Sequence, residues 1–158
     1  MSAQDQSSNV AGNTVQVSLF HACHAPCPRM RKHMLDSLQS YEQRDGYLMY
    51  LTRLVNVHDI GAHLSLDCRT LAAILLKNAA LKWWPYADPA NPQHEQQKAE
   101  LVSFLTSYLD EPQCSVAFQL HCLTAQLLRL TWPDQFRGML CAFVQAMAKE
   151  PSALVCYR

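Results

Sequence analysis

The chain has 158 residues, of which 49% are hydrophobic and 16% are charged, and its formal net charge is zero. This length supports one domain with a sizeable core, and the apolar content argues against wholesale disorder. A zero net charge provides no bulk attraction to nucleic acid. The densest basic stretch, Arg29–Lys32, is short and is better explained as a solvated helix face.

The cysteines and the first residues indicate the compartment. The chain has 7 cysteines at irregular spacing, and this odd number favours free thiols in a reducing compartment over a disulfide framework. Residues 1–13 are polar and lack the basic start and apolar stretch of a secretory signal. The longest apolar run, Leu71–Leu76, is far shorter than the roughly 20 residues that span a bilayer. We therefore expect a soluble intracellular protein without membrane insertion.

Beyond a flexible tail expected over residues 1–13, the chain predicts a series of helices. Apolar residues recur at the spacing of one helix face in the segments 14–25, 28–42, 44–57, 63–84, 94–110, 114–131 and 134–149. The first segment is ambiguous, because Val15, Val17 and Leu19 also alternate as in a strand. The longest segment, 63–84, has its predicted apolar stripe at Leu64, Cys68, Leu71, Ile74, Leu75, Asn78 and Leu81.

Taken in pairs, these helices predict an all-α fold, a right-handed α-solenoid of HEAT-like antiparallel helix pairs. The second helices of successive pairs are roughly 40–50 residues apart, within the range of HEAT and armadillo units. About three and a half repeats would occupy residues 14–158 as one domain, incomplete at its carboxyl end. A globular bundle of about six or seven helices is the alternative, and the spacing favours the solenoid only modestly.

Several short motifs follow one another at characteristic distances. The central motif combines an acid, an arginine, a small apolar run, Lys-Asn and two tryptophans, at Asp67, Arg69, Leu71–Leu76, Lys77, Asn78, Trp83 and Trp84. Flanking motifs stand on both sides of it, at Arg31–Leu38, Gly46-Tyr47, Asp110–Pro112, Gln119, Trp132-Pro133 and Phe136. Each motif is weak alone. In this order, residues 14–148 resemble the amino-terminal domain of importin-β-like (karyopherin-β) nuclear transport receptors.

The resemblance implies a protein that binds partners and is not an enzyme. Its implied partners are the GTP form of the small GTPase Ran and protein cargo, with nucleoporins as further candidates and no direct contact to nucleic acid. It implies shuttling between cytoplasm and nucleus, and neither a cofactor nor a metal. The residues that the resemblance assigns to Ran binding are Arg31, Lys77, Asn78, Lys82 and Trp84.

Each of these assignments has a structural alternative. Asn78 falls on the predicted apolar stripe, where its amide would satisfy a buried carbonyl between repeats. Exposed lysines are common, so Lys77 and Lys82 carry little information individually. Of Trp83 and Trp84, we expect one to pack against the next pair and the other to be partly exposed. A HEAT-like protein-interaction scaffold without Ran binding is the alternative function.

Other reactive or charged residues favour structural interpretations. Potential zinc ligands gather in one short segment, and four ligands so close together differ from the separated pairs of structural zinc sites: His21, Cys23, His24 and Cys27. His121 cannot activate Cys122, because adjacent helical residues point about 100° apart. Asp67 and Arg69 are too close along a helix to face each other, and we expect Arg69 to reach a neighbouring repeat.

Overall fold

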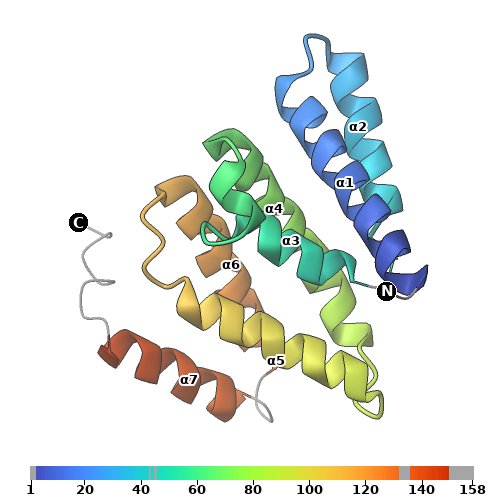
Figure 1. The fold of residues 1–158 in the computed structure, drawn as a ribbon. Helices are drawn as coiled ribbons and strands as arrows, with labels where there is room; N and C mark the ends of the chain where they lie inside the picture. Colours follow the sequence, from blue (N-terminus) through green and yellow to red (C-terminus); the bar gives the residue numbers. More distant parts are fainter. Residues whose placement is uncertain (1–2, 43, 45, 132–135, 150–158) are drawn as a thin grey trace. The chain divides into compact units, whose positions relative to one another are not determined.

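A computed structural model describes residues 3–42, 44, 46–131 and 136–149 of the chain. These described residues form the α-helices α1 (Ala3–His24), α2 (Pro28–Ser40), α3 (Tyr47–Val55), α4 (Leu66–Trp83), α5 (Pro92–Ser107), α6 (Cys114–Leu130) and α7 (Phe136–Lys149), which are labelled in Figure 1. Two 3-10 turns, η1 (Ile60–His63) and η2 (Trp84–Tyr86), precede and follow α4. All regular structure in the described ranges is helical, which confirms the all-α prediction. None of the helices described is both long and apolar enough to span a membrane.

The chain divides into two compact units, Met1–Ala72 and Ala73–Arg158, and the boundary falls inside α4. We had expected one domain over residues 14–158. The first unit contains α1, α2, α3 and the beginning of α4, and the second contains the rest of α4 with α5, α6 and α7. Trp132 and Pro133, which contributed to the predicted motif order, lie outside the described residues.

In the first unit, α1 and α2 lie side by side and antiparallel (Figure 1). Val15 and Leu19 are buried, whereas Val17 is 55% exposed, so the ambiguous segment has a helical period. Pro28 occupies the first turn of α2, where its missing N–H is harmless. The Cys27 Sγ caps this helix by accepting a hydrogen bond from the backbone N–H of Met30 at 3.4 Å.

The first helix begins much earlier than we expected. Residues 1–13 were predicted as a flexible tail, but α1 already begins at Ala3. This segment is polar and contains no proline that would interrupt a helix. A helix that forms over residues 14–24 can therefore extend towards the amino terminus, because adding a residue to an existing helix costs less than starting a new one.

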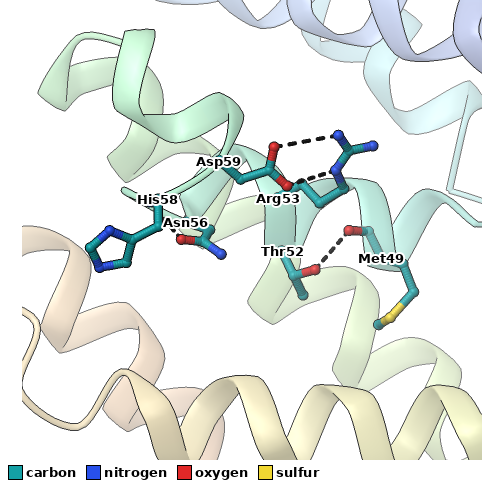
Figure 2. Close-up of polar contacts among 6 residues, drawn as sticks. All are labelled: Met49, Thr52, Arg53, Asn56, His58 and Asp59. Atoms are coloured by element: carbon teal, nitrogen blue, oxygen red, sulfur yellow. Dashed lines mark hydrogen bonds and ion pairs between the residues drawn. The ribbon is translucent and has the colours of Figure 1, made fainter.

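The connection that follows α3 is held by local polar contacts (Figure 2). The Arg53 Nε donates to the Asp59 Oδ2 at 2.8 Å, and the backbone N–H of His58 donates to the Asn56 Oδ1 at 2.7 Å. Gly61, in η1, lies against the end of α3, where a Cβ atom would be 2.7 Å from the Leu54 carbonyl oxygen. Only a residue without a side chain fits so close to another backbone.

The buried face of α4 is rotated from the one we predicted. Its buried residues are Cys68, Arg69, Ala72, Ala73, Leu75, Leu76, Ala79 and Ala80. Three predicted core residues, Leu71, Ile74 and Leu81, are only half-buried, and Asn78 is exposed. Alanine weighs little on a hydropathy scale, but its small side chain lets neighbouring helices approach closely. Four alanines therefore lie on the packed face together with Leu75 and Leu76.

In the second unit, α5 begins at Pro92 with Asn91 as its N-cap, whose Oδ1 accepts the backbone N–H of Gln93 at 3.0 Å. Buried leucines of α5 and α6 contribute to the core of this unit, at Leu101, Leu105, Leu120, Leu123 and Leu127. The last helix, α7, contacts both α5 and α6 and buries Phe143. Helix α5 therefore begins at Pro92, two residues before the predicted first residue 94.

Candidate protein-binding surface

A direct polar contact joins α4 to α6. The Lys77 Nζ donates to the Gln119 Oε1 at 2.7 Å, across 42 residues of sequence. Both side chains are partly buried, so the contact is shielded from much of the competing water. The motif order had singled out both residues, but not their mutual contact. Lys77 is therefore a link between two helices in addition to being a charged surface group.

Two other predicted residues on α4 are exposed. Asn78 is on the exposed face and not in the core stripe, which contradicts the buried structural role that we considered for it. Lys82, in the last turn of the same helix, is also exposed. With the half-buried Leu81 between them along the chain, they place a polar, basic surface on the carboxyl-terminal half of α4.

Of the two tryptophans, the predicted binding residue is the buried one. Trp84 is 7% exposed and has the Lys98 Nζ 5.7 Å from its ring centroid. Trp83 is half-buried and meets the rings of Trp84 and His94 edge-on, with centroids 6.3 Å and 5.8 Å away. The expected division into one packed and one partly exposed indole is present. The indole that a partner could reach is that of Trp83, because Trp84 is buried.

Phe118, on α6, is a surface residue that the sequence analysis missed. Its side chain is 62% exposed, immediately before the Gln119 that receives the hydrogen bond from Lys77. A signal was present, since Phe118 falls off the apolar stripe formed by Val116, Leu120 and Leu123. An exposed aromatic ring beside polar groups is typical of a protein-binding surface.

Arg69 reaches back to the end of α3, the helix that precedes α4. It is 6% exposed, and its Nε donates to the carbonyl oxygen of Val55 at 3.0 Å. Val55 is the last residue of α3, where the carbonyl groups have no helical partners. The hydrogen bond therefore satisfies an acceptor at the end of the helix that precedes α4.

Arg31 is exposed on α2 and belongs to the first unit. The other four residues assigned to Ran binding belong to the second unit. Within that unit the structure places Lys77, Asn78 and Lys82 on one helix, whereas Trp84 is buried after its end. The structural basis for a binding surface is therefore the exposed side of α4 and α6 in the second unit.

The histidines and cysteines near the end of α1 make separate contacts. His24 stacks on Phe20 with ring centroids 4.4 Å apart, and Cys27 caps α2. Cys23 is half-buried. Burial, followed by interaction with the Cys68 side chain of α4, raises the pKa of Cys23 to about 12. Among the described residues, no group of three or more His, Cys, Asp or Glu could hold a metal ion.

Comparisons of the chain with protein-family models, with curated proteins and with solved structures gave no match. The importin-β resemblance therefore remains a prediction that rests on the order of the motifs. The structure shows in addition that Lys77 and Gln119, which belong to two different motifs in this order, are hydrogen-bonded to each other.

Proposed function

We propose that this chain is the amino-terminal part of an importin-β-like nuclear transport receptor, which binds Ran in its GTP form and contributes to the transport of protein cargo. In this proposal its helices form HEAT-like pairs, α1 with α2, α3 with α4 and α5 with α6, and α7 begins a fourth pair. The pairs stack as an α-solenoid.

The hydrogen bond from Lys77 to Gln119 is the observation that carries the proposal. In a stack of helix pairs, the second helices of successive pairs are neighbours and line one surface. The proposal takes α4 and α6 as the second helices of two successive pairs, and the direct contact between them supports this arrangement.

The surface of these two helices supports the binding of a protein. Lys82 and the exposed Arg129 of α6 provide positive charge, and Phe118 provides an exposed aromatic ring. Basic side chains favour an acidic partner surface and accelerate association, while a buried aromatic ring supplies most of the affinity of such contacts. Ran bound to GTP is the partner that the motif resemblance implies for this surface.

A scaffold without Ran binding is the second candidate, and two observations favour it. Trp84 is buried, and the amino group of Lys77 is already bonded to Gln119. Two of the five residues assigned to Ran therefore have structural roles in this chain. The surface around Phe118 and Lys82 would then serve another protein partner.

Retention of Ran on the immobilised full chain distinguishes the two candidates. Ran loaded with a non-hydrolysable GTP analogue and Ran loaded with GDP are compared at low salt. We expect retention of the GTP form only. The substitution Lys82→Glu should weaken it roughly five- to tenfold, because it reverses a charge at the contact. The matched control is Arg137→Glu, which reverses one exposed charge on α7, outside the proposed surface.

Three results of this experiment would contradict the proposal. Retention of neither form at roughly 50 µM would contradict Ran binding by this chain and leave the scaffold as the better candidate. Equal retention of both nucleotide forms would contradict recognition of the GTP state. Equal losses from Lys82→Glu and Arg137→Glu would show that only net charge matters, and that the exposed side of α4 is not the contact.

A further inference from the structure

We propose that Lys77 and Gln119 together form a binding site for a carboxylate, supplied by a glutamate or aspartate in an amphipathic segment of a protein partner. The 2.7 Å hydrogen bond from the Lys77 Nζ to the Gln119 Oε1 joins the two side chains across α4 and α6. This inference rests on the protein-binding surface proposed above for these two helices, and it specifies the chemical group that the surface binds.

The mutual contact of Lys77 and Gln119 uses only part of their hydrogen-bonding capacity. A lysine ammonium group has three N–H donors and no acceptor, so the amide oxygen of Gln119 is the atom that faces it. The contact uses one of these donors, and the Gln119 Nε2 carries two further N–H groups on the other branch of the amide. The pair can therefore offer a positive charge and an amide donor to the two oxygens of one carboxylate.

The helical segments around this pair favour a negatively charged ligand. Residues 73–83 and 114–130 contain Lys77, Lys82 and Arg129 but neither aspartate nor glutamate. A carboxylate therefore finds basic side chains and no like charge on these segments. Charge-assisted hydrogen bonds are also roughly twice as strong as those between neutral groups, so a carboxylate is a better ligand here than an amide or a hydroxyl.

Apolar side chains on both helices surround the position of the pair. Ile74 and Leu81 lie three residues before and four residues after Lys77 on one face of α4, and both are half-buried. On α6, the ring of Phe118 is 62% exposed in the residue before Gln119. The ligand that matches this surface carries its acidic group among apolar side chains, as on one face of an amphipathic helix.

The charge of the whole chain favours a protein carboxylate over a nucleic-acid phosphate. The formal net charge is zero, so the long-range attraction that dominates binding to nucleic acid is absent. The hydrogen bond between Lys77 and Gln119 also holds both side chains in place before a ligand arrives. This lowers the side-chain entropy that binding would cost and favours recognition of a single carboxylate at a defined position.

The test is fluorescence anisotropy with the full chain and a labelled helical peptide that has glutamates among leucines at helical spacing. We expect this peptide to bind with a Kd of roughly 100 µM at low salt. The same peptide with glutamine in place of each glutamate should bind at least about tenfold more weakly. Both peptides are measured on the unsubstituted chain, so this comparison does not depend on whether a variant folds.

The variant Gln119→Glu separates the role of the pair in the fold from its role in binding. The new carboxylate would keep the contact with Lys77 as an ion pair, but it would occupy the ammonium group and repel an acidic peptide. We expect an unchanged or higher unfolding temperature and a roughly tenfold loss of peptide binding. The matched control, Gln145→Glu, adds the same charge at an exposed position of α7 and should change binding less than about twofold.

Four results would overturn the proposal. These are no binding of the glutamate peptide, equal binding of the glutamate and glutamine peptides, equal losses from Gln119→Glu and Gln145→Glu, and competition by double-stranded DNA as strong as that by unlabelled peptide. The retention of Ran is measured separately. Ran retained in its GTP form without peptide binding would contradict this site and leave the proposed function in place. Peptide binding without retention of Ran would support the site and favour the scaffold.

Discussion

Two polar side chains of α4, Arg69 near its beginning and Lys77 in its second half, reach other helices in different ways. Arg69 is 6% exposed and donates to a backbone carbonyl at the end of α3. Lys77 is only partly buried and donates to the side chain of Gln119 on α6. The first contact joins α4 to α3, and the second joins α4 to α6.

The two contacts differ in how easily each could be replaced if its donor were removed. A backbone carbonyl at a helix end is fixed in position, and when buried it must be satisfied. The amide of Gln119 can rotate, and water could replace Lys77 in a partly exposed site. We therefore expect Arg69 to contribute more than Lys77 to the free energy of unfolding, and Lys77 to act mainly on the contact between α4 and α6.

The largest effect is expected for Arg69→Ala. This substitution leaves the Val55 carbonyl without its buried donor and should lower the free energy of unfolding by about 2–3 kcal/mol. Urea denaturation followed by circular dichroism measures the loss. The matched control is Arg129→Ala on the exposed side of α6, which should change stability by less than about 0.5 kcal/mol. Equal effects of the two substitutions would remove the distinction between buried and surface arginines.

A somewhat smaller effect is expected for Gly61→Ala, which acts on the same end of α3. The added Cβ would clash with the carbonyl oxygens of Leu54 and Asn56, which are backbone atoms and cannot move aside easily. We expect a loss of about 1–2 kcal/mol in the same denaturation measurement. Gly138→Ala is its control, because a Cβ there meets nothing within 4 Å and alanine favours the helix α7. A destabilisation by Gly138→Ala as large as that by Gly61→Ala would contradict the account of close packing at η1.

The smallest effect is expected for the surface ion pair of Arg53 and Asp59, which Figure 2 shows beside the α3 end. The hydrogen bond from Arg53 holds the pKa of Asp59 below its ordinary value. Its stabilising contribution is therefore complete above the ordinary pKa and is lost as the pH falls through the lowered one. The Arg53 side chain is 56% exposed, so this contribution should be less than about 1 kcal/mol.

The variant Asp59→Asn tests this pH dependence. Its unfolding free energy should be below that of the unsubstituted chain at pH 7, and the difference should shrink at about pH 2.5. A difference that grows on acidification would show that Asp59 is destabilising when charged, contrary to the geometry of the pair.

The sequence predicted the helices and their order because the apolar period and the prolines are local signals. It did not predict which side of α4 is buried, since alanines have a small hydropathy and their burial depends on close approach by other helices. The choice between Trp83 and Trp84 likewise depended on side chains from α5, His94 and Lys98, that no local pattern reveals. Motif order identified Lys77 and Gln119 separately, but only the three-dimensional structure joins them.

A double-mutant cycle on Lys77 and Gln119 tests most directly whether α4 and α6 are joined as successive second helices, on which the proposed function depends. The variants Lys77→Met, Gln119→Leu and their combination are compared with the unsubstituted chain by urea denaturation. We predict a coupling free energy of about 0.5–1.5 kcal/mol, because a partly buried, charge-assisted hydrogen bond is lost only once in the double variant. Additive losses, with no coupling beyond error, would contradict the joint between the two helix pairs.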